Sequence, residues 1–223
     1  MDDIGLDDAA NHELRSRMVA TQVEARGVTD PSVLKALREV PRHVFVPESH
    51  RHRSYDDGAF SIGEGQTISQ PYIVGLMTAL IRPSPLMRVL EVGTGSGFQT
   101  AVLARCVGDV FSIENHANLA RRAEALLREL GIGNVHFKVG DGFDGWAEHA
   151  PFDAIVVTAA PRKLPQPLLD QLKVGGRLVA PVGESGSKQG QELVVVTRNQ
   201  DGWAGEKVGT VMFVPMTGKA EAN

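Results

Sequence analysis

Cysteine is almost missing from this sequence, since Cys106 is the only one among 223 residues. A single cysteine excludes a disulfide within the chain and any metal site built on several thiolates. No other set of side chains indicates a metal ligand group, so we expect no bound metal. A protein without disulfides suits a reducing compartment, and we therefore expect the cytoplasm.

Long apolar runs and basic clusters are lacking as well. No apolar stretch approaches the roughly 20 residues that a membrane-spanning helix needs. The N-terminal segment MDDIGLDDAANHE is acidic and lacks the basic and apolar parts of a signal peptide. The net charge is -4 and the basic run 50–53 is short, so we predict an exposed loop there. We expect neither nucleic acid nor a membrane as a partner, and a monomer.

What the sequence does contain is an ordinary globular composition with a regular alternation of elements. Hydrophobic residues make up 42% and charged residues 22% of the chain. Apolar runs predict strands at 89–92, 110–113, 135–139, 154–158, 177–182, 192–197 and 208–214. Helical segments separate most of them, which is typical of parallel βαβ units with helices on both faces. The last two runs have no room for a helix between them, so we expect these two strands to be antiparallel.

The first 84 residues have a different texture and are predicted to form a helical and loop extension to an α/β domain at 85–223. Residues 1–10 contain four aspartates and read as a loose tail. We predict helices over 12–26, from Pro31 onward and over about 70–81. The stretch 54–69 is rich in glycine, serine and aspartate, and is predicted to be a long loop.

The strongest functional signal is VLEVGTGSGFQT at residues 89–100, where a predicted strand runs into a glycine-rich turn. Gly93, Gly95 and Gly97 permit positive φ and a close approach of ligand at the carboxyl end of a strand. A dinucleotide fingerprint would need a glycine where Phe98 stands. Glu91 would repel a pyrophosphate but suits a cationic ligand.

Polar residues end the next two predicted strands. Glu114 lies about 20 residues beyond the glycine turn, where an acid can accept both hydroxyls of a ribose. Asp141 and Gly142 follow the third strand, where a short polar turn can meet an adenine. Taken alone, the glycines could form only a tight connection, and Glu114 could merely favour the start of a helix.

Together these positions resemble the class I S-adenosylmethionine-dependent methyltransferase family, over residues 85–200. The resemblance implies a Rossmann-like, doubly wound sheet and S-adenosylmethionine as the cofactor. It implies cofactor contacts from Thr67, Ile68, Glu91, Gly93, Thr94, Gly95, Ser96, Glu114, Asn115, Asp141 and Gly142.

A second motif, IGEGQTISQP at residues 62–71, precedes the cofactor region. It resembles the hallmark of the protein-L-isoaspartate O-methyltransferase family. The same family is similar at PRHVFVPE (41–48), PFDAIVVTAAP (151–161), LKVGGRLVAPVG (172–183) and FVP (213–215). One departure is Met212, where the family often has a basic residue. The resemblance implies a seven-stranded sheet whose final strands leave the common methyltransferase order.

The resemblance also implies a substrate and a site for it. The acceptor would be the free α-carboxylate of L-isoaspartyl residues in damaged proteins, with D-aspartyl residues as a further substrate. Ser69 would be the catalytic residue that holds this carboxylate, and Ile62, Gly63, Gly65, Gln66 and Ser69 would bind the substrate. Ser69 alone could instead be a helix N-cap followed by Pro71 in the first turn. Both roles place it at a helix N-terminus, which favours an anion.

A carboxylate is ionised at neutral pH, so the reaction implied here needs no general base. His43, His50 and His52 are candidates by residue type only, and surface or packing roles explain them as well. The enzyme would act by positioning the carboxylate against the methyl group and by excluding water.

Three rival functions remain open. The first is an O-methyltransferase acting on another carboxylate or on a small molecule. Methylation of an amine is disfavoured, because residues 158–161 read TAAP where enzymes that methylate amines have N/D-P-P-Y/F. A nicotinamide oxidoreductase conflicts with Phe98 and Glu91. A non-catalytic protein that binds S-adenosylmethionine would have no need for the 62–71 motif.

Overall fold

The computed structural model describes residues 9–184, 186 and 189–221. Most of the predicted loose tail lies outside this range, but Ala9 and Ala10 already belong to the first helix. Within the described part of the chain, no helix is long and apolar enough to cross a membrane, and no three His, Cys, Asp or Glu side chains are grouped to hold a metal ion.

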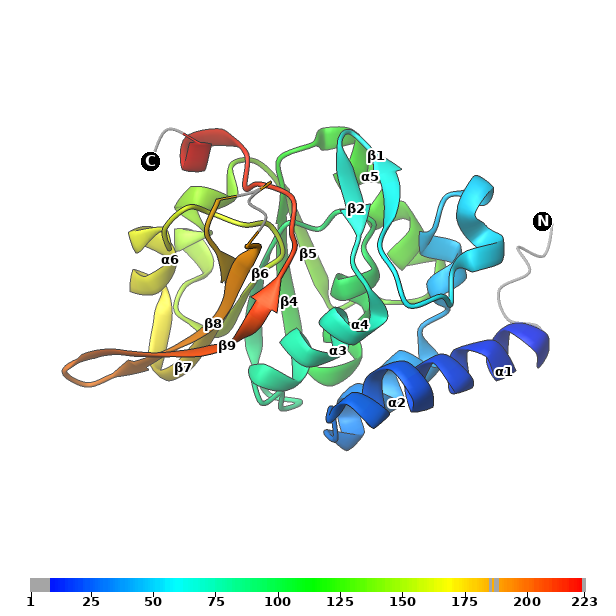
Figure 1. Cartoon of the computed structure of the whole chain (residues 1–223). Helices are drawn as coiled ribbons and strands as arrows, with labels where there is room; N and C mark the ends of the chain where they lie inside the picture. The colour runs from blue at the N-terminus through cyan, green and yellow to red at the C-terminus, as the bar shows by residue number, and fades with distance from the viewer. Residues whose placement is uncertain (1–8, 185, 187–188, 222–223) are drawn as a thin grey trace.

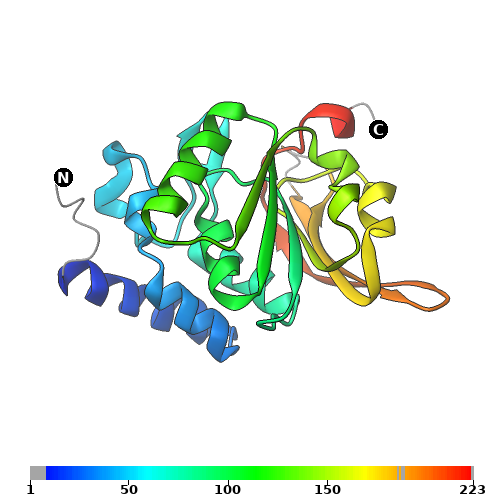
Figure 2. The same cartoon turned by 180° about the vertical axis from the view of Figure 1, so that it is seen from behind.

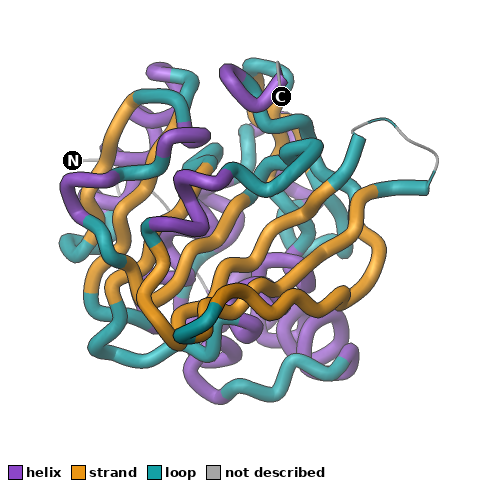
Figure 3. Tube along the Cα trace, turned by 90° about the vertical axis from the view of Figure 1, so that its left-hand side faces the viewer, coloured by secondary structure: helices purple, strands orange, loops and turns teal. Residues whose placement is uncertain are grey.

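Seven strands form one sheet in the order β5-β4-β3-β6-β7-β8-β9 (Figures 1 and 3). Their bounds are β3 Arg88–Val92, β4 Asp109–Glu114, β5 Val135–Val139, β6 Phe152–Val157, β7 Leu172–Val182, β8 Gln191–Asn199 and β9 Gly202–Val211. Neighbours from β5 to β7 pair in parallel, whereas β8 is antiparallel to both β7 and β9. The predicted α/β fold with a mostly parallel, seven-stranded sheet is confirmed, including the antiparallel last pair.

The seventh strand begins earlier than predicted. It was expected at 208–214, but β9 starts at Gly202 after a two-residue turn and ends at Val211. Every residue from Trp203 to Thr210 is exposed, so the strand lacks the alternation of apolar and polar residues that marks a half-buried strand. The β8–β9 hairpin projects beyond the rest of the sheet (Figures 1 and 2).

Each face of the sheet has its own apolar core, because successive strand residues point to opposite sides. Val89 of β3 packs with the helices α2 to α5, whereas its neighbour Leu90 packs on the side of α6. The helix bounds are α2 Pro31–Glu39, α3 Pro71–Leu80, α4 Phe98–Cys106, α5 Ala117–Glu129 and α6 Gln166–Asp170. Short helical turns follow β5 at Gly142–Asp144 (η5) and Ala147–His149 (η6), and another lies at Gly218–Glu221 (η7).

The N-terminal part is largely helical, as predicted. α1 (Ala9–Met18) continues through a π-helical turn η1 (Val19–Val23) and a 3-10 turn η2 (Glu24–Arg26). α2 begins where the Thr-Asp-Pro sequence indicated, with the Asp30 side chain accepting bonds from the backbone N–H groups of Ser32 and Val33. Turns η3 (Arg42–Phe45) and η4 (Glu48–Arg53) follow. The basic run 50–53, predicted as a loop, thus lies in a 3-10 helix.

The long loop predicted at 54–69 is wrong in its second half. β1 (Phe60–Gly63) and β2 (Gln66–Ile68) form an antiparallel hairpin there. Its turn has positive φ at Gly63, Glu64 and Gly65 (92°, 52° and 72°), and two glycines make such a turn accessible. Strands of three and four residues are too short to produce a clear periodic pattern.

Candidate active site

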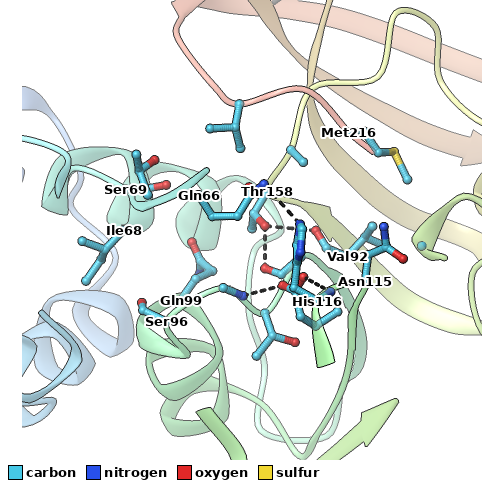
Figure 4. Close-up of a pocket in the computed structure, with 18 of the residues that line it drawn as sticks. Gln66, Ile68, Ser69, Val92, Ser96, Gln99, Asn115, His116, Thr158 and Met216 are labelled. Atoms are coloured by element: carbon cyan, nitrogen blue, oxygen red, sulfur yellow. Dashed lines mark hydrogen bonds between the residues drawn. The ribbon is translucent and has the colours of Figure 1, made fainter. Parts of the chain in front are cut away.

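A pocket opens at the carboxyl ends of β3, β4 and β6, the edge where open α/β sheets bind ligands (Figure 4). It is enclosed by the glycine-rich turn after β3, the end of β4, strand β2 with the following Ser69, and the segment 214–217. The structure brings together these predicted site residues along its wall: Gln66, Thr67, Ile68, Ser69, Gly93, Thr94, Gly95, Ser96, Glu114, Asn115 and Gly142.

The glycine-rich turn needs its glycines for protein packing as well as for ligand approach. Gly93 has φ +99°, and a Cβ there would lie 2.3 Å from Thr158 Oγ1. Gly97 has φ +88°, and its Cβ would meet the Leu127 side chain of α5 at 2.8 Å. Larger residues would push the turn away from β6 and from α5, so the glycines fix the floor of the pocket.

Glu114 is held in a fixed orientation inside the pocket. Its Oε2 accepts the Gly95 backbone N–H at 2.8 Å and its Oε1 accepts the His116 backbone N–H at 2.8 Å. Only 6% of the residue is exposed. Because each carboxylate oxygen has a second lone pair, both can still accept a hydrogen bond from a pair of vicinal hydroxyls.

Glu91 does not line the pocket, although direct contact with the cofactor was predicted. It is fully buried, and its Oε2 accepts bonds of 2.5 Å from the hydroxyls of Thr100 and Ser112. Its Oε1 has no hydrogen-bond partner among the described residues. Ser112 Oγ lies 2.6 Å from Thr94 Oγ1, so Glu91 reaches the pocket through these two hydroxyls. Burial raises the pKa of Glu91 to about 8.

Four further predicted site residues lie beside the pocket without lining it. Asp141 caps η5 through the Phe143 backbone N–H and accepts the Lys219 backbone N–H, which ties down the C-terminal segment. Ile62 is buried in the apolar core, and the remaining two residues, Gly63 and Gly65, form the exposed turn of the hairpin. Their roles in binding stay predictions.

The charge of the pocket selects among ligands. None of the described residues that line it is a lysine or arginine, and Glu114 is the one carboxylate among them. A pyrophosphate would face this carboxylate without any side-chain cation to offset the repulsion. A cationic sulfonium with an attached ribose fits the same groups, and this agrees with Phe98 standing in place of the third dinucleotide glycine.

A second groove meets this pocket at Ser69. It runs between α3 and β9, and its lining shares Thr67, Ser69, Thr158 and Val214 with the first pocket. Ser69 is not the N-cap of α3: that residue is Gln70, and no described side chain caps the helix. Pro71 occupies the first turn as predicted. Ser69 therefore stands one residue before the N-cap of an uncapped helix and belongs to the lining of both cavities. Figure 4 shows it on the wall of the first pocket.

Comparison with known proteins identifies the family to which the chain belongs. Residues 13–221 match the family model described as protein-L-isoaspartate(D-aspartate) O-methyltransferase. A protein-L-isoaspartate O-methyltransferase of Picosynechococcus sp. is 52% identical over 205 residues, which cover 92% of this chain and 90% of the relative. One from Methanospirillum hungatei is 50% identical over 204 residues, covering 92% and 93%. The chain belongs to this family.

Solved structures agree with the assignment to the protein-L-isoaspartate O-methyltransferases. One structure of that name superimposes with a TM-score of 0.83 at 31% identity, over 92% of this chain and 67% of the other. A Plasmodium falciparum structure in complex with S-adenosyl-L-homocysteine has a TM-score of 0.76 over 91% of this chain and 98% of the other. At 24% identity, the second comparison supports the fold alone.

Several pocket residues of this methyltransferase were missed from the sequence. His116 lies opposite the hairpin, with Nε2 3.5 Å from Gln66 Nε2 (Figure 4). Thr158 holds the end of β6 to that of β3 by donating to the Gly93 carbonyl at 2.6 Å. The segment 214–217 closes the pocket and is fastened by a 3.0 Å bond from Asn115 Nδ2 to Thr217 Oγ1. The similarity of 151–161 and 213–215 to the family was the one signal that pointed to Thr158 and to the segment 214–217, and no signal pointed to His116.

The three histidines considered from the sequence lie elsewhere. His43 is buried, with Nδ1 2.7 Å from the Tyr55 hydroxyl. His50 stacks on Phe60 at a centroid distance of 5.9 Å. His52 is exposed in η4, and none of the three lines the pocket.

Proposed function

We propose that this chain transfers a methyl group from S-adenosylmethionine to the free α-carboxylate of L-isoaspartyl residues in damaged proteins, and accepts D-aspartyl residues as well. Membership of the isoaspartyl methyltransferase family supports this reaction. The observation that carries the assignment of the site is the position of Ser69, where a pocket suited to a cationic nucleoside meets a groove open to a peptide.

The residues present fit S-adenosylmethionine. Glu114 would accept the ribose hydroxyls, and the turn 93–96 would pass close to the amino acid end. Asn115 and Gly142 would flank the adenine, with Thr67 and Ile68 covering the opposite side. Bound there, S-adenosylmethionine supplies an electrophilic methyl group. Glu91 and Asp141 contribute indirectly, by supporting Thr94 and the C-terminal segment.

The acceptor carboxylate is held at the start of α3. Ser69 Oγ donates one hydrogen bond to it, and the first-turn N–H groups of an uncapped helix add further donors and a partial positive charge. The carboxylate is already ionised, so the chain needs no general base. Orienting it against the methyl group contributes up to roughly 7–11 kcal/mol in favourable systems.

The groove beside β9 would let the enzyme bind substrates of many different amino-acid sequences. β9 pairs with β8 and lies at the end of the sheet, so its outer backbone groups are open to another strand. An extended substrate pairs with such an edge through its backbone, independent of its side chains. Gln66 and the hairpin turn with Gly63 and Gly65 leave room for the extra backbone atom of an isopeptide. After transfer, the following amide nitrogen attacks the ester carbonyl and methanol leaves, which gives a succinimide that hydrolyses in part to normal aspartate.

The test compares an isoaspartyl peptide with its normal aspartyl twin. Methyl transfer, measured as S-adenosylhomocysteine formed and methanol released, is expected from the isoaspartyl peptide alone. Transfer to both peptides, or to neither, would reject the function and favour a different carboxylate or a small-molecule acceptor.

Replacing Ser69 with alanine tests the site. Ser69→Ala is expected to lower kcat/KM for the isoaspartyl peptide roughly 10- to 100-fold, the value of a hydrogen bond to a charged group. The dissociation constant of S-adenosylhomocysteine, measured by calorimetry, should stay nearly unchanged. Ser49→Ala, an exposed serine of η4 that lines neither cavity, is the matched control. Full activity of Ser69→Ala would remove Ser69 from the substrate site.

We further propose that the protein works as a cytoplasmic monomer. The lone Cys106 is buried, which suits a chain that forms no disulfide between copies. Light scattering behind a sizing column would measure the mass, and a stable dimer would contradict this proposal.

A further inference from the structure

Arg42 is completely buried, which is unusual for a residue with a charged head group. It belongs to the segment PRHVFVPE and lies in η3. Its Nε donates to the Ser54 carbonyl at 2.8 Å and its Nη2 donates to the Gly58 carbonyl at 3.2 Å. The two carbonyls bracket the segment 54–58, so one guanidinium fixes both of its ends.

The same guanidinium touches the cofactor side of the site. Its central carbon lies 4.8 Å from the ring centroid of Phe98, and that ring packs edge-on against Phe45. Phe98 directly follows Gly97, the last glycine of the turn, and lines the cofactor pocket. Arg42 is therefore in contact with the residue that begins α4 under the cofactor.

The segment that Arg42 holds continues to the substrate side. Asp57, inside this segment, accepts a 2.6 Å bond from Gln70 Nε2. Gln70 is the N-cap of α3 and the neighbour of Ser69. Gly58, whose carbonyl Arg42 binds, lines the groove beside β9. A continuous set of contacts thus joins Phe98 to the residue before the helix.

We infer that Arg42 is a positioning residue for methyl transfer, which sets the place of Ser69 and of the groove wall relative to the cofactor pocket through segment 54–58, Asp57 and Gln70. This inference rests on the proposed function. Arg42 contacts neither the substrate nor the cofactor in this role. Lysine cannot replace it, because one ammonium lacks both the planar face that stacks on Phe98 and the fork that spans two carbonyls.

The first experiment measures kinetics of Arg42→Lys with an isoaspartyl peptide. We expect KM for the peptide to rise about tenfold, as for the loss of one hydrogen bond at a polar site. The dissociation constant of S-adenosylhomocysteine should change less than about threefold, since the glycine turn and Glu114 are intact. A purely structural role would reduce the amount of folded enzyme and hence apparent kcat, but would not move KM. Arg51→Lys, on the exposed surface of η4, is the matched control and should keep wild-type KM.

The second experiment removes the intermediate contact. The Asp57 side chain is 43% exposed, so Asp57→Ala folds even if Arg42→Lys does not. It should raise KM for the peptide in the same direction. Asp57→Ala also removes the 3.4 Å ion pair between Asp57 and Arg26, so Gln70→Ala, which keeps that ion pair, is measured beside it. Combining the two changes should add little to the effect of Asp57→Ala alone, because both remove the bond between Asp57 and Gln70. An unchanged KM in Asp57→Ala, or two fully additive effects, would overturn the inference.

The outcomes separate this inference from the proposed function. If the wild-type protein fails to methylate the isoaspartyl peptide, the proposed function is lost. If the wild-type protein is active and Arg42→Lys folds with unchanged KM, only the role of Arg42 is lost.

Discussion

At the scale of single residues, the carboxyl group of Glu91 makes stability depend on pH. Burial raises its pKa from 4.5 in the unfolded chain to about 8 in the folded protein. Between pH 4.5 and about 8, Glu91 therefore keeps its proton in the folded state and has lost it in the unfolded state. The stability that this group contributes is fully present below pH 4.5 and is lost as pH rises through about 8.

Glu91→Gln should remove this dependence. Glutamine has nearly the same shape, and its carbonyl oxygen can accept the bonds from Thr100 and Ser112. Urea unfolding of both proteins from pH 4.5 to about 8 should show the free energy of unfolding falling more steeply for the wild type. Parallel curves would mean that Glu91 titrates as it does in the unfolded chain.

Gly93 offers a test of the cofactor turn. A methyl group at Gly93 would lie 2.3 Å from Thr158 Oγ1 and would occupy a backbone conformation with φ +99°. We expect Gly93→Ala to weaken S-adenosylhomocysteine binding at least about tenfold, because the turn must shift. Gly133→Ala, where a Cβ meets no atom within 4 Å, is the control. Equal affinities, measured by calorimetry, would contradict this account of the turn.

Sequence reasoning located most of the pocket at this scale, because each signal was local. The glycines, Glu114 and Ser69 each stand at the end of an element, and parallel strands bring such ends to one edge. Glu91 was misplaced because an acid beside a glycine turn looks like a ligand contact, while the strand points it toward α4. His116 was missed because a lone histidine at a helix start has no distinguishing pattern.

At the scale of elements, the cap of α2 is the clearest local determinant. Asp30 Oδ1 accepts the backbone N–H groups of Ser32 at 2.9 Å and of Val33 at 3.1 Å. Asp30→Ala should lower the free energy of unfolding by about 1 kcal/mol, whereas Asp30→Asn should retain most of it. Urea unfolding would measure both, and an alanine variant as stable as the wild type would show that α2 is held by packing alone.

The sequence predicted elements well where burial is complete and poorly where it is not. The central strands β3, β4 and β6 are buried along nearly their whole length and read as mostly apolar runs, in which Glu91, Ser112 and Glu114 are the buried polar exceptions. The exposed strand β9 and the short strands β1 and β2 carry no such pattern. Their positions depend on pairing with a neighbouring strand and are not marked by a local apolar pattern.

At the scale of the whole molecule, the pocket is completed by contacts between distant parts of the chain. Asn115 and Thr217, which close it, are 102 positions apart. The backbone of Met216 donates to Ala160 at 2.9 Å, and Ala160 donates to Val214 at 2.8 Å. The alternation of strands and helices predicted a mostly parallel sheet, but it predicted neither the order of the strands nor this closure, since nothing local in FVPMT specifies its partner.

Thr217→Val should loosen the closed pocket. Valine keeps the shape and removes the acceptor for Asn115, so S-adenosylhomocysteine should bind about fivefold more weakly, as for one net hydrogen bond. Since the stabilisation by a ligand grows with the logarithm of its concentration divided by Kd, the rise in melting temperature at equal ligand concentration should shrink. Thr21→Val, in η1, should behave as the wild type. An unchanged ligand-induced shift in Thr217→Val would show that this bond does not hold the wall.

Because residues 214–217 form one wall of the pocket, the pocket cannot close until late in the synthesis of the chain. Translation produces β3, β4 and β6 first, and with them the floor of the pocket, but the wall leaves the ribosome only after the whole sheet has been synthesised. A growing chain therefore cannot yet enclose the nucleoside. The closed form of the pocket, and with it the added stability that a bound ligand would give, is therefore available only once residues 214–217 are in place.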